Sequence, residues 1–130
     1  MTDQSTPPVR YYRSLPLETE LWLLSGLNNL NSNGTIDALG WPWYNCRDMQ
    51  NLLNRVYIAN LTIWGIDCGI MNGDEWGYYW TLVCDDYAYD SPNRQYSANW
   101  FFVPFEERIS KLKQDHLLEK AVFSCTIGTL

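Results

Sequence analysis

Residues 65–84, GIDCGIMNGDEWGYYWTLVC, constrain the fold more than any other segment. Asn72-Gly73 divides two stretches that are rich in aromatic and β-branched residues, which is the pattern of an antiparallel hairpin. A four-residue connection over 72–75 places Met71 opposite Trp76. A two-residue turn at Asn72-Gly73 would move the register by two positions and keep the same residues on each face. The chain is therefore predicted to contain this hairpin, whichever turn closes it.

Side chains of a strand alternate between its faces, so the hairpin divides into two surfaces. The expected core face carries Trp64, Ile66, Cys68 and Ile70, opposite Gly77, Tyr79, Thr81 and Val83. On the second face, Tyr78 is expected opposite Gly69. Trp80 is expected opposite Asp67, beside Gly65. Such rings, with a carboxylate and bare glycine backbone, could stack a nucleobase and accept its hydrogen bond. Alternatively, the rings only shield the glycine backbone.

The remaining chain predicts further strands and one helix. Strands are expected at 19–25, 55–63, 98–105 and 121–127, and a helix at 104–120 that begins with Pro104. Residues 26–51, rich in Asn, Gly and Ser, predict a long loop with a short helical turn at 47–53. Together these elements indicate an α+β fold: a small, strongly bent antiparallel sheet or SH3-like barrel with one C-terminal helix. Residues 10–130 would form this single domain after a flexible tail at 1–9.

Composition excludes several classes of function. The 130 residues carry a net charge of −6, which argues against general nucleic-acid binding and suits a basic partner. No apolar run reaches membrane-spanning length, and the first ten residues, MTDQSTPPVR, lack a signal-peptide pattern. We therefore expect no membrane contact and a cytoplasmic location. Cys46, Cys68, Cys84 and Cys125 form no C-x-x-C pair, so buried thiols are expected, with no metal and no cofactor.

Two other groupings could carry chemistry. They are the acidic cluster Asp85, Asp86 and Asp90, and His116 with Cys84 or Cys125 as its nucleophile. The acidic cluster has no calcium-loop spacing, so a solvated turn is the simpler interpretation. The histidine lacks any nucleophile signature around it, and the chain contains no phosphate-binding glycine motif. The sequence therefore predicts that the protein is not an enzyme, with a weak hydrolase as the remaining alternative.

The basic residues favour Arg, with six against three Lys. Arginine contacts phosphate with two parallel hydrogen bonds and stacks on rings. Arg55 is expected to open a strand and Arg108 to lie in the first helical turn. If both approach Trp80 or Trp100, they would form a site for a phosphorylated aromatic ligand. The alternative is scattered surface ion pairs.

A resemblance extends from LLNRVYIANLTIWGIDCGI through WGYYWTLVCDDYAYDS. These segments resemble small, uncharacterised cyanobacterial proteins in which an R-V-Y strand precedes a G-x-x-C-G-x hairpin with a W-x-Y return. More loosely, the layout resembles phage Thoeris anti-defence sponge proteins, which form dimers or larger oligomers and sequester a cyclic ADP-ribose signal without cleaving it. This resemblance implies ligand contacts at Arg55, Asn99, Trp100, Arg108 and Asp115.

Two functions follow as hypotheses. The first is a non-enzymatic, homo-oligomeric protein that sequesters a small nucleotide-like signal in the cytoplasm, which is the host's cytoplasm if a phage encodes it. Its expected ligand-binding residues are Arg55, Asp67, Tyr78, Trp80, Asn99, Trp100, Arg108 and Asp115. The alternative is an acidic protein–protein inhibitor or immunity-type protein that masks a basic partner surface.

Overall fold

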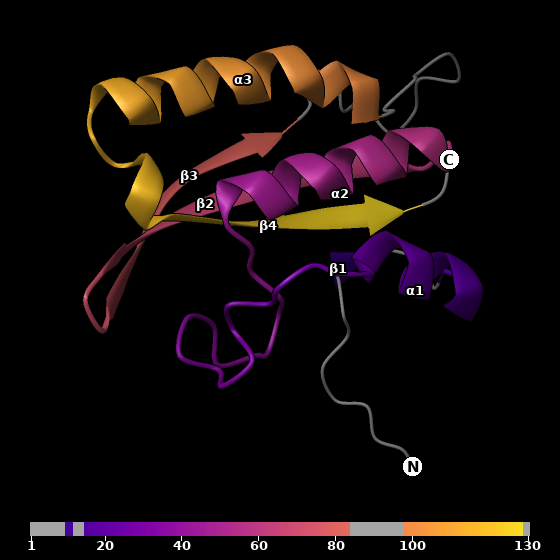
Figure 1. The fold of residues 1–130 in the computed structure, drawn as a ribbon, viewed down its shortest axis with the longest axis horizontal. Coiled ribbons are helices and arrows are strands. Elements are labelled where there is room, and N and C mark those ends of the chain that lie inside the picture. The colour runs from indigo at the N-terminus through magenta and orange to yellow at the C-terminus, as the bar shows by residue number, and fades with distance from the viewer. Residues whose placement is uncertain (1–9, 12–14, 84–97, 129–130) are drawn as a thin grey trace.

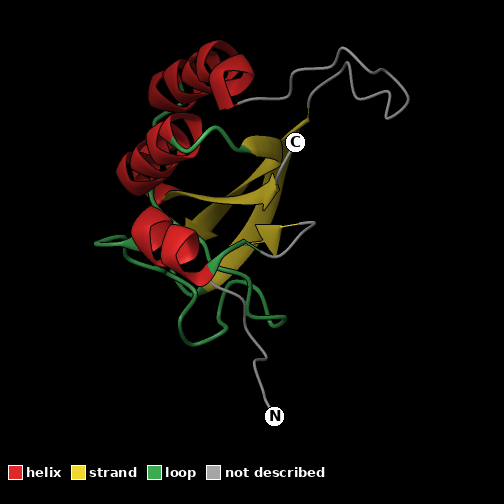
Figure 2. Cartoon of the chain, turned by 90° about the vertical axis from the view of Figure 1, so that its right-hand side faces the viewer, coloured by secondary structure: helices red, strands yellow, loops and turns green. Residues whose placement is uncertain are grey.

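The computed structural model describes residues 10–11, 15–83 and 98–128 and has an α+β fold. The elements are, in order, β1 (Arg10–Tyr11), α1 (Leu17–Leu24), α2 (Cys46–Ile58), β2 (Thr62–Asn72), β3 (Glu75–Val83), α3 (Ala98–Gln114), the 3-10 helix η1 (Leu118–Lys120) and β4 (Ala121–Gly128). The sheet order is β1-β4-β2-β3. The three α-helices lie side by side on one face of this open sheet (Figures 1 and 2). The α+β class and the antiparallel arrangement of β3, β2 and β4 are confirmed.

The predicted hairpin is formed by β2 and β3, and its turn end has the expected register. Asn72 lies opposite Glu75, and Gly73 adopts a positive φ of 68° in the turn between them. Beyond that end the register changes. Gly69 faces Tyr78 but Cys68 faces Trp80, so Tyr79 is an additional residue in β3 and forms a bulge.

Beyond the bulge, the side chains of β3 lie on the opposite face of the sheet from the one predicted. Trp80 lies opposite Cys68 and packs against the main core, whereas Thr81 lies opposite Asp67. The predicted pairing of Asp67 with Trp80 is therefore wrong. Tyr79 and Thr81, expected in the core, are both exposed. One extra residue is sufficient for this exchange because side chains alternate with a period of two.

The segment expected to be a loop and then a strand is the helix α2. Asn45 caps it, because its side-chain oxygen accepts a hydrogen bond of 2.8 Å from the Asp48 backbone N–H. The buried residues follow helical spacing over the whole segment: Met49, Leu52, Leu53 and Val56. This stripe crosses the boundary placed between the loop and the strand at 55–63. The loop prediction holds up to residue 45 and the helical turn predicted at 47–53 lies within α2, whereas the strand predicted from residue 55 is wrong.

Two further strand predictions are also corrected to helices. Residues 19–25 belong mainly to α1, which follows Pro16. Residues 98–105 form the first half of α3, which therefore begins six residues before Pro104 and contains that proline. Phe101, Phe105, Ile109 and Leu112 are all buried along one side of α3. Phe101 extends the apolar stripe by one turn, and its burial favours helix upstream of the proline.

The main core lies between the helices and the sheet, and Phe123 of β4 is central to it. The centroid of its ring lies 5.4 Å from that of Phe105 and 6.1 Å from that of Trp80. A second, smaller cluster lies on the opposite face of the sheet. It comprises Ile36, Trp43 and Val122, with Met71 and Trp76 packed against them. The loop at 25–45 thus supplies side chains to the sheet face that the helices leave open.

This loop is held by backbone and side-chain hydrogen bonds. Tyr44 exchanges two backbone hydrogen bonds of 2.7 Å with Phe123, which fixes the loop to β4. The buried Asn31 accepts from the backbone N–H groups of Ile36 and Asp37 and donates to two carbonyl oxygens, including that of Trp41. The segment predicted as a loop is therefore an ordered part of the domain.

Candidate functional site

The eight predicted ligand residues do not form one site. Trp80 lies on the helix-facing side of the sheet, where the Arg108 guanidinium carbon is 4.8 Å from its ring centroid. This cation–π contact brings two predicted ligand-binding residues together. The Trp80 ring, however, packs against the main core. Asp67 and Tyr78 belong to the opposite face, so they cannot share a site with Trp80.

Arg55 has a structural role that explains its position. It lies on α2, where Nη1 donates to the carbonyl oxygens of Leu23 at 2.9 Å, Ser25 at 2.7 Å and Trp22 at 3.4 Å. These carbonyls lie at the C-terminal end of α1, where the carbonyl of Trp22 also accepts the Ser25 backbone N–H and those of Leu23 and Ser25 are left for a side-chain donor. Arg55 therefore caps α1 and joins it to α2, and is not on a strand as predicted.

The predicted residues of α3 are likewise separate. Asp115 follows the helix and pairs with Lys111 at 3.2 Å, an exposed contact between residues four apart. Asn99 and Trp100 belong to the first turn of α3, and their side chains lie outside the described part of the structure. The acidic cluster at 85–90 and Cys84 also lie outside the described residues.

The open face of the hairpin retains part of the predicted surface. Thr81 Oγ1 donates to Asp67 Oδ1 over 2.8 Å. The Tyr78 ring is 56% exposed and meets the Trp76 indole edge-on, with centroids 6.5 Å apart. The Trp76 indole covers Gly69 so closely that an added Cβ would overlap it. Shielding of glycine backbone therefore occurs on this face, although Trp76 provides it.

Among the described thiols, Cys68 and Cys125 are buried and Cys46 is half-buried. Burial is the main cause that raises the pKa of Cys68 to about 12 and that of Cys46 to about 11. Both thiols are therefore protonated at neutral pH. Cys125 is buried, whereas His116 is exposed just beyond α3 with a positive φ of 59°. Within the described ranges, no three His, Cys, Asp or Glu residues are grouped to hold a metal ion.

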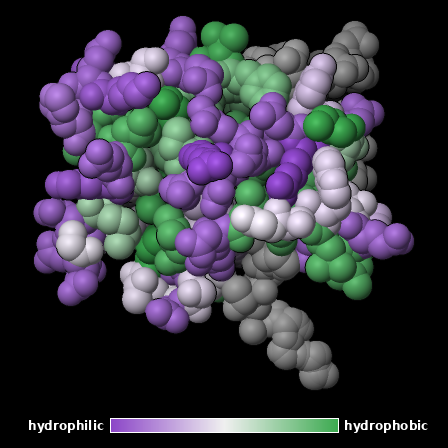
Figure 3. Space-filling view, viewed as in Figure 1, coloured by the Kyte–Doolittle hydropathy of each residue, from purple (hydrophilic) through white to green (hydrophobic). Residues whose placement is uncertain are grey.

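A surface that is not among the sequence-based predictions lies on the outside of the helices. Ten large hydrophobic side chains are exposed in the described residues, and six of them lie on α1, α2 and α3. The six, which we call the outer helix surface, are Leu17, Leu21, Trp22, Tyr57, Ile58 and Val103. Figure 3 shows hydrophobic side chains on the right, over α1 and the end of α2, and at the top over α3. The capping contacts of Arg55 hold together α1 and α2, which carry five of these six residues.

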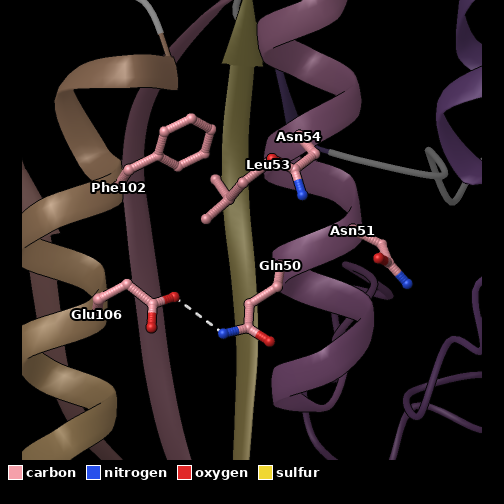
Figure 4. A pocket seen from close by; sticks show the side chains of 6 residues that line it. All are labelled: Gln50, Asn51, Leu53, Asn54, Phe102 and Glu106. Atoms are coloured by element: carbon pink, nitrogen blue, oxygen red, sulfur yellow. Dashed lines mark hydrogen bonds between the residues drawn. The ribbon is translucent and has the colours of Figure 1, made fainter.

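A groove between α2 and α3 lies next to this surface (Figure 4). Its volume is about 280 Å³, and its lining residues are Gln50, Asn51, Leu53, Asn54, Phe102 and Glu106. Gln50 Nε2 donates to Glu106 Oε2 over 2.9 Å across the groove. Phe102 also meets Tyr57 edge-on at 5.7 Å, so the apolar end of the groove is continuous with the outer helix surface.

The charged residues beside this region are largely acidic. Glu18 is exposed on α1 next to Leu17, and Glu106 and Glu107 are exposed on α3. Two cations lie on α2: Arg55 is engaged by the carbonyls of α1, and Arg47 is exposed in the first turn. An apolar surface with acidic residues at its border is suited to contact an apolar surface with basic residues around it.

The sequence did contain a signal for this surface. Leu17 and Leu21 are four residues apart and Trp22 follows directly, so a helix over LETELWLL is apolar on more than its buried side. Leu23 alone is fully buried in α1. The signal depends on assigning a helix there, because in a strand the same residues would alternate differently.

Comparisons with known proteins returned no match, whether with family models, curated proteins or solved structures. In the described part of the chain, every helix is too short or too polar to cross a membrane.

Proposed function

We propose that this chain is a non-enzymatic binding protein whose outer helix surface docks onto a basic surface of another protein and masks it. The observation that carries the proposal is the concentration of exposed apolar side chains on the helices, next to a groove and beside acidic residues. Exposed apolar side chains that gather on neighbouring elements, rather than being scattered singly, are a mark of interaction sites. Trp22 and Tyr57 are also of the residue types that contribute most to protein interfaces.

Charge favours a basic partner over a second copy of the chain. The net charge is −6, and Glu18, Glu106 and Glu107 would face like charges in a self-interface. A partner with Lys or Arg around an apolar centre would instead be attracted by all three glutamates. A homo-oligomer is the competing occupant, and the crosslinking experiment below distinguishes it.

Site-specific photo-crosslinking tests the proposal. A benzophenone amino acid replaces Ile58 or Val103 in cells that express the protein natively, and Gln114, exposed at the end of α3, serves as the control position. We expect one basic protein to be captured from both test positions and not from the control. Capture of a second copy alone, or equal capture from the control, would contradict the proposal.

A small nucleotide-like ligand remains a second candidate on the open sheet face. Ser124 is 1% exposed, lies opposite Asp67, and its Oγ has no hydrogen-bond partner among the described residues. The Tyr78 ring on the same face is available for stacking. If this face binds a cyclic ADP-ribose-type nucleotide, such a ligand raises the melting temperature of the native chain and not that of Tyr78→Ala. An equal shift in both proteins would count against it.

A further inference from the structure

We infer that the groove between α2 and α3 determines which partner binds: it takes an extended segment with the pattern apolar–any residue–Arg or Lys. This inference rests on the proposed function and specifies the partner's chemistry. The partner segment would lie along the groove with the apolar side chain near Phe102 and the cation at Glu106.

The apolar end of the groove is formed by Phe102 and Leu53. Leu53 is 1% exposed and contributes to the groove lining, while Phe102 is half-buried and meets Tyr57 at an interplanar angle of 63°. The whole volume, about 280 Å³, is just below the range of about 300–1,000 Å³ typical of small-molecule pockets. The groove is therefore large enough for a side chain of a partner segment.

The opposite end offers a carboxylate to a cation. Glu106 Oε2 accepts from Gln50, and a carboxylate can accept about four hydrogen bonds in total. No cationic side chain among the described residues forms an ion pair with Glu106. Its negative charge also contributes, after burial, to the raised pKa of Cys46. A guanidinium or ammonium group at this end would supply the missing counter-charge.

The α2 wall favours an extended segment over a helix. Asn51 and Asn54 lie three residues apart on one face of α2, and neither carboxamide bonds to another described residue. A carboxamide both donates and accepts, so it can pair with the free N–H and C=O groups of an extended backbone. A helical segment has already used these groups internally.

The spacing of the two ends fits this arrangement. Phe102 and Glu106 are four residues apart in α3, which is about 6 Å along the helix axis. Alternate side chains of an extended chain are about 6.6 Å apart and point to the same side. An apolar residue and a cation separated by one residue therefore reach both ends of the groove together.

Amide chemical shifts of the full, ¹⁵N-labelled chain test this inference. The probe is the capped peptide Gly-Leu-Ser-Arg-Gly, with Gly-Leu-Ser-Glu-Gly as the charge-reversed control. A third peptide is alanine-rich and helical, with Leu and Arg four residues apart. We expect the first peptide alone to shift the amide signals of residues 50–57 and 102–106, since only it meets both ends and the α2 wall.

Two matched variants locate the cation. Glu106→Gln keeps an acceptor for Gln50 but removes the charge, and is expected to weaken peptide binding about fivefold. Glu107→Gln removes the same charge from the neighbouring exposed position and should leave the affinity within about twofold. Equal effects of the two variants would overturn the assignment of Glu106.

The outcomes also separate this inference from the proposed function. If the helical peptide shifts the groove signals and the extended one does not, or if no peptide shifts them, the inference is wrong. Capture of a basic protein from Ile58 and Val103 would in that case still support docking. Conversely, groove shifts without such capture would support the peptide site and contradict the outer helix surface as the docking face.

Discussion

Gln50 donates a hydrogen bond of 2.9 Å to Glu106, and this contact joins α2 to α3 across the groove on the outside of the molecule. Beneath it, both helices are fixed to the sheet by buried stripes, with Leu53 on α2 and Phe105 on α3 each only 1% exposed. The position of the groove is thus determined by the core. A partner segment would meet a surface that is already formed, which lowers the ordering cost of binding.

Loss of the Arg55 cap should destabilise the whole domain. In Arg55→Ala, the carbonyl oxygens of Leu23 and Ser25 lose a charged donor, and hydrogen bonds to charged groups contribute about 1.5–3 kcal/mol. We expect the free energy of unfolding, measured by urea titration, to fall by about that amount. Arg47→Ala removes an exposed Arg from the first turn of the same helix and should change it by less than about 0.5 kcal/mol. Similar losses in both variants would disprove the capping role.

Two glycines of the hairpin should respond differently to alanine. A Cβ at Gly69 would overlap the Trp76 indole. Overpacking of this kind lowers the free energy of unfolding by about 1–3 kcal/mol. A Cβ at Gly77 meets nothing within 4 Å, so Gly77→Ala should be neutral or slightly stabilising. The measurement is the melting temperature of each variant by differential scanning calorimetry. A stable Gly69→Ala protein would show that Trp76 does not cover this backbone.

Stability should decline in alkaline solution because of the buried thiols. Their pKa values are raised from 9.0 to about 12 for Cys68 and about 11 for Cys46, chiefly by burial. Above about pH 9 the unfolded chain loses these protons while the folded chain keeps them, so the unfolded state binds fewer protons. The free energy of unfolding is therefore unaffected by these groups below pH 9 and falls as pH rises toward 11–12.

The slope of stability against pH identifies the thiol responsible. Cys68→Ala changes the absolute stability through packing, but it should also make the decline above pH 9 shallower. Burial also raises the pKa of the Tyr44 phenol, which acts in the same direction at higher pH. Denaturant titrations at a series of pH values from 7 to 11 give the slope. An unchanged slope in the variant would mean that Cys68 ionises equally in both states.

The elements predictable from the sequence were those with local signals. Asn72 and Gly73 located the hairpin turn, and the strand after α3 was confirmed as β4. The helix α1 and the second half of α2, beyond the turn predicted at 47–53, were assigned as strands because short apolar runs fit helix and strand equally until burial is known. The bulge at Tyr79 was also unpredictable, since alternation of side chains contains no mark for an inserted residue.

The candidate site was less predictable than the fold for the same reason. The exposed positions of Trp22, Ile58 and Val103 follow only from correct helix assignments. Of the residues predicted to bind a ligand, Trp80 packs against the core and Arg55 caps a helix. Chemically versatile side chains serve structure as readily as binding, and only their contacts distinguish the two.

The affinity of the crosslinked partner for defined variants tests docking through the helices most directly. Trp22→Ala removes an aromatic side chain from the outer helix surface, whereas Leu39→Ala removes an even more exposed apolar side chain, 75% exposed, from the 25–45 loop. By isothermal titration calorimetry, we predict that Trp22→Ala weakens binding at least about 30-fold, as for an interface hot spot of about 2 kcal/mol. Leu39→Ala should bind within about twofold of the native chain. Equal affinities of the two variants would contradict docking through this surface.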